Sequence, residues 1–191
     1  MFFYASVVSS KNPVPACIID AEDTDVYVIA ARVSHEIPAP LFMYRKGKYY
    51  NCKDLCSSEV RQYINEIHVI SGCDSVSGFY GHGKKTIIKK AIASIQICEK
   101  LNQLGKTVPF DEKYLPDIED FVLKCIYGEK NTTFSNLRRA KSWNKMKKKN
   151  TARLNPDLDS LLQHVKRANY QLYIYANYHD PSPPPSLFGN G

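Results

Sequence analysis

Short apolar runs separated by polar segments make up the first part of the chain, residues 1–70. The run Ala16–Ile19 ends directly in acidic residues, which is typical of a buried strand in a parallel sheet. Val26–Ala31 restores the apolar character and fits either a short helix or a strand. Aromatic and apolar residues flank the Lys46-Gly47 pair within Leu41–Tyr50, and this arrangement predicts a hairpin.

Helical periodicity dominates the rest of the chain. Apolar residues recur there every three or four positions, and glycines stand where the stripes end. Possible helix caps, Ser, Asn and Asp, precede several of these stripes. The predicted helices are Met1–Ser9, a segment from Ser57, Lys84–Leu104 with Gly105 as its stop, Pro116–Gly128, and a segment capped by Asn155-Pro156-Asp157.

Together these patterns predict an α/β fold with a partial, Rossmann-like parallel sheet, followed by an all-α, basic C-terminal half. Four parts follow from the changes in composition. They are the α/β segment 1–70, the glycine- and lysine-rich element 71–105, a helical basic region 106–180, and a Pro-rich tail 181–191.

Charge is distributed unevenly along the 191 residues. Residues 1–80 carry seven Lys/Arg and nine Asp/Glu, a balance of −2, so the remainder must carry +9 to reach the net charge of +7. Carboxylates hold divalent metals and lysines meet phosphates, so one partner, metal-bound nucleic acid, suits both halves. Residues 138–153 contain eight basic residues and no acid, which fits a phosphate-binding stripe, a solvated helix face or a nuclear-import signal.

The cysteines and the hydropathy of the chain indicate its compartment. Six cysteines without a CxxC spacing are typical of reduced, intracellular thiols. Nothing in the sequence approaches the ~20 apolar residues that span a bilayer. We therefore expect an intracellular protein, nuclear or cytoplasmic, with no membrane partner.

Acidic residues directly follow the first predicted strand. Carboxylates at the carboxyl end of a parallel strand lie where open α/β sheets bind ligands. Asp23 and Asp25, two apart in an extended segment, would point the same way and share a hard cation such as Mg²⁺ or Mn²⁺. The alternative is a polar turn whose acids are merely solvated.

A glycine-rich segment closed by lysines precedes the long predicted helix. Gly78, Gly83 and Lys84 nearly spell a Walker A loop, but Lys85 occupies the position where Ser or Thr must bind Mg²⁺. Nucleoside triphosphate binding is therefore not expected. The segment fits a tight turn between two helices whose amides, with Lys84, Lys85 and Lys89, approach a DNA strand. An ordinary connecting loop is the other interpretation.

The order of these two segments resembles a known family. Ala21–Val26, followed by Gly72-Cys73-Asp74 with Gly78, Gly81, Gly83 and Lys84, is similar to the PIN-like nucleases of the flap endonuclease/XPG superfamily over residues 15–100. The spelling Gly72–Ser77 and the later Asp159–Tyr170 also resemble PIN-like reading frames of animal genomes that are linked to mobile elements.

The resemblance implies a set of functional residues. Asp23, Asp25 and Asp74 would be ligands of Mg²⁺ or Mn²⁺, with Glu22 behind them. Residues 1–70 would be the C-terminal part of a PIN-like core. Residues 71–105 would contain a helix–two-turn–helix element that grips duplex DNA, with a monovalent cation held by carbonyls of Ser71–Thr86.

The chain also departs from the family pattern. The family's first strand carries an Asp, and a later helix begins with further acids; both elements would precede Met1 here. Most of the metal cage is then missing, so we expect a truncated or degenerate, inactive member of a metal-dependent, structure-specific nuclease family. The alternative is a non-catalytic module, derived from a mobile element, that binds nucleic acid or a protein.

Overall fold

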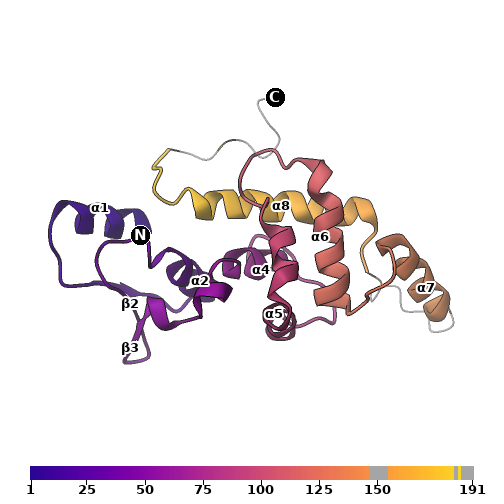
Figure 1. The fold of residues 1–191 in the computed structure, drawn as a ribbon, viewed down its shortest axis with the longest axis horizontal. Coiled ribbons are helices and arrows are strands. Elements are labelled where there is room, and N and C mark those ends of the chain that lie inside the picture. The colour runs from indigo at the N-terminus through magenta and orange to yellow at the C-terminus, as the bar shows by residue number, and fades with distance from the viewer. Residues whose placement is uncertain (147–154, 183–184, 186–191) are drawn as a thin grey trace. The chain divides into compact units, whose positions relative to one another are not determined.

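The computed structural model shows a mixed α/β protein and describes residues 1–146, 155–182 and 185. Its strands form one three-stranded sheet near the N-terminus, and helices make up most of the rest (Figure 1). The α/β prediction is confirmed at this level. Within the described part of the chain, no helix is both long and apolar enough to cross a membrane.

The chain divides into two compact units. Unit 1 comprises Met1–Asn65 together with the segment that begins at Ile174, and unit 2 comprises Glu66–Tyr173.

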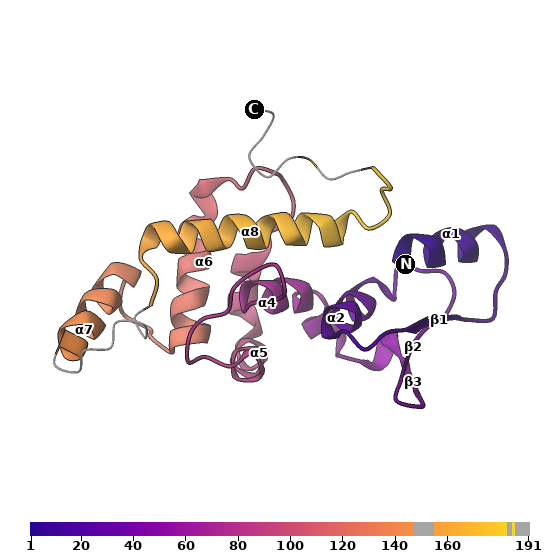
Figure 2. The same cartoon turned by 180° about the vertical axis from the view of Figure 1, so that it is seen from behind.

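The sheet of unit 1 combines a parallel and an antiparallel pair. Strand β1 (Cys17–Asp20) pairs in parallel with β2 (Leu41–Arg45), so that Cys17 lies opposite Leu41. Strand β3 (Lys48–Asn51) returns antiparallel to β2 around Lys46-Gly47, as predicted for this hairpin. The hairpin projects from unit 1 in both views (Figures 1 and 2).

Helices cover one side of this sheet. Helix α1 (Phe2–Lys11) confirms the predicted N-terminal helix, and α2 (Thr24–Val33) connects β1 to β2. Apolar side chains of these helices, of the strands and of the segments that follow α2 and β3 form a core that consists of Phe2, Ile19, Ala30, Val33, Ile37, Leu41, Met43 and Cys52.

The prediction that β1 is a buried strand is wrong for one of its faces. The strand order is β1-β2-β3, so β1 is an edge strand. Ile19 points into the core and is 5% exposed, whereas Ile18 on the opposite face is 58% exposed. A run of four apolar residues therefore has one covered face here instead of the two that such runs usually have in parallel sheets.

The segment predicted as a helix from Ser57 forms two short helices. After the 3₁₀ turn η1 (Cys52–Asp54), α3 (Ser58–Arg61) begins behind Ser57, whose hydroxyl accepts from the N–H of Val60 at 3.5 Å. Helix α4 (Ile64–Ile70) follows and leads the chain to the glycine-rich turn.

Unit 2 contains the lysine-rich helix that the sequence predicts, but the helix is shorter. Helix α5 (Lys84–Ala93) ends at Ser94, whose φ of −139° and ψ of 57° leave the helical region. A 3₁₀ segment, η2 (Ile95–Leu101), follows, and turns lead from it to Gly105. The predicted single helix Lys84–Leu104 is therefore interrupted.

Two further helical segments confirm the prediction for Pro116–Gly128. The turn η3 (Glu112–Tyr114) leads into α6 (Leu115–Phe121), which continues as the π-helical segment η4 (Val122–Tyr127). Gly128 ends it in the left-handed conformation with φ 75°.

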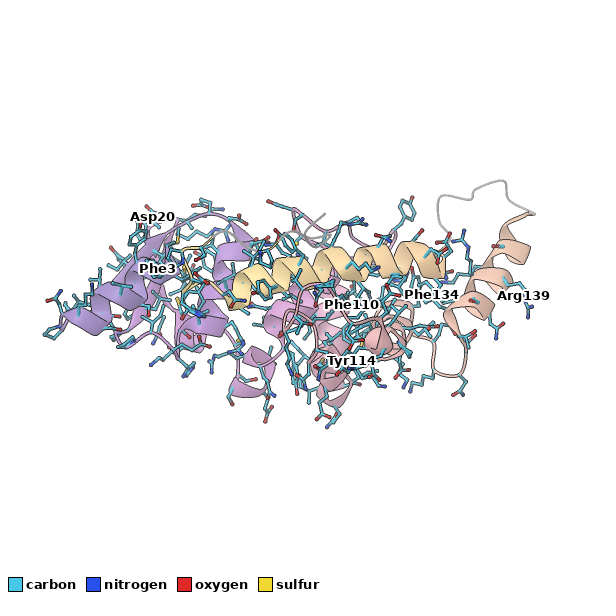
Figure 3. All side chains as sticks on the ribbon, turned by 90° about the horizontal axis from the view of Figure 1, so that it is seen from above. Phe3, Asp20, Phe110, Tyr114, Phe134 and Arg139 are labelled. Carbon is cyan, nitrogen blue, oxygen red and sulfur yellow. The ribbon has the colours of Figure 1, made fainter. Side chains whose placement is uncertain are left out.

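The last helices carry much of the basic region and the C-terminal apolar stripe. Helix α7 (Phe134–Met146) begins at the buried Phe134 and carries Arg139 in its middle (Figure 3). Residues 147–153 of the basic stretch lie outside the described residues. Helix α8 (Leu158–Ala176) begins behind Asp157, which accepts from the N–H of Ser160 at 2.8 Å and confirms the predicted cap.

Candidate functional site

The first group of candidate residues follows strand β1 in unit 1. Asp20 is the last residue of β1 and is exposed (Figure 3). Because α2 connects two parallel strands, the loop between Asp20 and α2 lies at the carboxyl end of the sheet, where such folds place ligands.

Asp23 acts as the N-cap of α2. Its backbone is extended, with φ −74° and ψ 130°, and its Oδ1 accepts the N–H of Asp25 at 2.9 Å. An N-cap carboxylate satisfies one of the unpaired amides at a helix start and suits the positive end of its dipole. Asp25 already belongs to the first turn of α2. The expected extended geometry for the pair is therefore wrong at Asp25.

Asp25 and Glu22 also contact specific neighbours in unit 1. The hydroxyl of Tyr175 donates to Oδ2 of Asp25 at 3.2 Å, and Tyr175 is only 9% exposed. Nε of Arg45 donates to Oε2 of Glu22 at 2.9 Å, and this hydrogen bond is the main cause of the raised pKa of Arg45. Sequence reasoning missed Tyr175 as a partner, because 150 positions separate it from Asp25.

These acids fit the implied metal pair poorly. A divalent cation such as Mg²⁺ takes about six oxygen ligands, and two ions need a cage of carboxylates. Asp23 and Asp25 each have one carboxylate oxygen in a hydrogen bond already. Among the residues that the structure describes, no group of three or more His, Cys, Asp or Glu is placed to hold a metal ion.

The second group of candidates forms the turn between α4 and α5 in unit 2. Cys73 and Val76 pair through two backbone hydrogen bonds, of 2.8 and 3.1 Å, which close a tight turn around the exposed Asp74. Gly72 enters this turn with φ 112°, and a Cβ there would lie 2.6 Å from Cα of Gly78. Only glycine fits that approach of two backbone segments.

Apolar anchors hold the turn against unit 2. Val76 and Phe79 are buried, and the ring of Phe79 lies 4.8 Å from that of His164 and 6.0 Å from that of Tyr127. Nε2 of His164 lies 2.9 Å from the carbonyl oxygen of Ile70, at the end of α4. Burial lowers the pKa of His164. The turn is thus a fixed part of the unit 2 core.

Helix α5 then begins at its glycine N-cap. Gly83 has an extended backbone with φ −71° and ψ 137°, and within the described chain no side chain caps this helix. Lys84, Lys85 and Thr86 form the first turn, so it contains no acid. The first amides of a helix carry partial positive charge, which favours an anion at this end.

The three candidate lysines of this helix point to different sides. Nζ of Lys84 lies 3.3 Å from Nδ1 of His68, which is fully buried, so Lys84 turns toward the interior of unit 2. Lys85 and Lys89, four residues apart, are both exposed. Residues at this spacing share one helix face. The outward basic face of α5 therefore consists of Lys85 and Lys89.

The other glycines of the turn have separate roles. Gly81 adopts φ 78° with open space around its Cβ position, so it provides a reversal of the chain rather than a close contact. The monovalent cation expected at carbonyls of Ser71–Thr86 stays a prediction.

The basic stretch on α7 makes structural contacts where its side chains are described. Arg138 donates to the carbonyl oxygen of Asn155 and lies 3.8 Å from Asp157, which joins α7 to the start of α8. Nζ of Lys141 lies 4.3 Å from the ring centre of Tyr127. The side chain of Lys145 is outside the described residues.

Comparisons of the chain with protein-family models, with curated proteins and with solved structures found no match.

Proposed function

We propose that this chain is a non-catalytic, PIN-like module that binds nucleic acid, with duplex DNA as the expected partner, through the α4–turn–α5 element of unit 2. The observation that carries the proposal is the exposed pair Lys85 and Lys89 beside the N-terminus of α5, which begins at Gly83. The rigid, glycine-built turn in front of it lets backbone amides approach a phosphate closely.

Electrostatics supports this type of partner. Two ammonium groups and a helix N-terminus on one surface bind phosphates without reading bases. The chain carries a net charge of +7, which draws any polyanion toward it. We therefore expect binding that depends on salt and that is weakly selective for sequence.

The acids of unit 1 support the non-catalytic form of the proposal. Asp23 caps α2, Asp25 accepts a hydrogen bond from the hydroxyl of Tyr175, and Glu22 pairs with Arg45. Each of these side chains has a contact that stabilises the fold. A structural reason for their presence therefore exists without a metal.

The test is the affinity of the purified chain for fluorescent duplex, flap and single-stranded DNA across a salt series. We expect the double substitution Lys85→Gln/Lys89→Gln to weaken duplex binding and to reduce the slope of log affinity against log salt by about 1.8, because each lost phosphate contact contributes about 0.9. The matched control is Lys46→Gln/Lys48→Gln, which removes two exposed lysines from the β2–β3 hairpin.

Two results would contradict the proposal. One is an absence of salt-dependent binding by the unmodified chain. The other is an equal loss in both double variants, which would mean that overall charge alone drives binding.

A second candidate is a metal-dependent nuclease, favoured by the position of Asp20, Asp23 and Asp25 at the carboxyl end of β1. A gel assay on flap and duplex DNA with Mg²⁺ or Mn²⁺ decides between the two. We expect no cleavage. Cleavage that the triple variant Asp23→Asn/Asp25→Asn/Asp74→Asn loses would establish the nuclease instead.

A further inference from the structure

A second basic feature of unit 2 is a cavity of about 550 Å³ beyond the C-terminal end of α5. Three lysines from three segments line it: Lys90 of α5, Lys124 of η4 and Lys130 of the following loop. Ser94 and Asn131 also line it, together with the apolar residues Ala93, Ile97 and Cys125. The sequence pattern gives no sign of this cluster, because the three lysines are separated in the chain.

Backbone contacts fix the inner part of this cavity. Nζ of Lys90 lies 3.5 Å from the carbonyl oxygen of Ile126, near the end of η4. A Cβ at Gly128 would lie 3.5 Å from the same Nζ. The helix η4 ends there in the left-handed conformation of Gly128, with the N–H of Glu129 bonded to the carbonyl oxygen of Leu123. The ammonium of Lys90 therefore lies beside the backbone at the end of η4.

The acids nearby do not balance this charge. Oδ2 of Asp120 pairs with Lys124 at 2.7 Å and with Lys100 at 3.2 Å, and Lys100 also pairs with Asp117 at 3.0 Å. In the described residues, Lys130 has neither an ion pair nor a hydrogen bond. Glu129 is its neighbour in sequence but is not one of the described residues that line the cavity. Among the described residues, only Lys124 of the three lysines has an ion pair, so an excess of positive charge remains at this cavity.

Concave sites lined by one sign of charge concentrate a counter-ion, since low-dielectric walls focus the field. Ammonium groups, a hydroxyl and an amide are together the usual donors to phosphate oxygens. We propose that the cavity of Lys90, Lys124 and Lys130 binds a phosphate group with two or more negative charges, such as a phosphate monoester or pyrophosphate. This site is separate from the Lys85 and Lys89 face and does not depend on the function proposed above.

The test is calorimetric titration of the full chain with pyrophosphate at low ionic strength, where screening is weak. We expect saturable binding at one site. The variant Lys124→Gln/Lys130→Gln should bind at least about tenfold more weakly, since it removes two of the three lysines that line the cavity. Lys90 is left in place because it also contacts the backbone at Ile126.

The control Lys46→Gln/Lys48→Gln removes the same charge from unit 1 and should leave the affinity for pyrophosphate unchanged. If Lys124→Gln/Lys130→Gln disturbs the circular dichroism spectrum, Lys130→Gln alone serves, because Lys130 is exposed in a loop. A titration without a saturable heat of pyrophosphate binding would overturn the proposal. An equal loss of pyrophosphate affinity in the control would also overturn it.

Two further arms identify the source of the phosphate group. A single-stranded oligonucleotide with a 5′-phosphate is compared with its 5′-hydroxyl form. A gain from the phosphate that Lys124→Gln/Lys130→Gln abolishes would assign the site to strand ends. Pyrophosphate binding without that gain would assign it to a small phosphorylated molecule. Pyrophosphate binding that persists in Lys85→Gln/Lys89→Gln would show that this site stands even if the proposed nucleic-acid face fails.

Discussion

Gly72 tolerates less change than the other glycines of the turn before α5. Its φ is 112°, and a Cβ would lie 2.6 Å from Cα and 2.8 Å from N of Gly78. Both atoms belong to the backbone, so neither can move aside without a large cost in free energy. We expect Gly72→Ala to lower the free energy of unfolding by about 3 kcal/mol, from overpacking and an unfavourable backbone conformation together. Urea denaturation followed by circular dichroism measures the change.

Gly81→Ala is the matched control for this substitution. Gly81 also has a positive φ, 78°, but nothing lies within 4 Å of its Cβ position. Only the left-handed conformation is then penalised, at a cost of about 1 kcal/mol. Equal losses in the two variants would show that Gly72 and Gly78 do not approach each other as described.

The sequence is enough to predict which way each lysine of α5 points. Lys84 lies three and seven positions before Ile87 and Ala91, which are buried, so helical spacing already places it on the inner face. Lys85 and Lys89 fall on the other side. The contact of Tyr175 with Asp25 could not be predicted from helical spacing, because no local periodicity relates residues 150 positions apart.

Helix α2 offers a test of what Asp23 does. If Asp23 is a helix cap, Asp23→Ala should lower the free energy of unfolding by about 1 kcal/mol, whereas Asp23→Ser should retain most of it, because both Asp and Ser are good caps. Urea denaturation with and without Mg²⁺ provides the measurement. A ligand that binds only the folded state raises its stability in proportion to the logarithm of its concentration. We expect no such increase.

A metal site would give a different result in the same experiment. Mg²⁺ would then stabilise the unmodified chain, and Asp23→Ser would abolish that stabilisation although it keeps the cap. This pattern would revive the assignment of Asp23 as a metal ligand.

Helices, strands and turns were predictable where one local sequence signal determines their position. The hairpin at Lys46-Gly47 and the cap at Asp157 are such cases, since turn and cap chemistry acts over a few residues. The break at Ser94 was missed because the apolar stripe continues past it: Ile87 and Ala91 are buried on α5, and Cys98 and Leu101 on η2. The exposed face of β1 was missed for a related reason. Composition indicates a strand, but only tertiary packing decides how many of its faces are covered.

The loss of folding stability at acid pH is a property of the whole folded chain, because buried histidines resist protonation. Burial, the main cause, lowers the pKa of His164, and nearby Arg167 lowers it further, while the carbonyl oxygen of Ile70 acts in the opposite direction. Burial lowers the pKa of the partly buried His82 as well. In the unfolded chain each imidazole has a pKa of about 6.5. The stability due to each is therefore complete above about pH 6.5 and is lost as the pH falls toward the lowered folded value.

We expect the free energy of unfolding to be constant just above neutral pH and to fall as the pH drops below about 6.5, with a slope of up to about 1.4 kcal/mol per pH unit for each such histidine. His164→Gln should reduce this slope by the contribution of one proton, whatever it does to absolute stability. His179→Gln is the control, since this side chain is exposed. Urea denaturation at a series of pH values measures both slopes. An unchanged slope in His164→Gln would mean that His164 is protonated as readily in the folded chain as in the unfolded one, and that its contact with Ile70 is not made by a neutral ring.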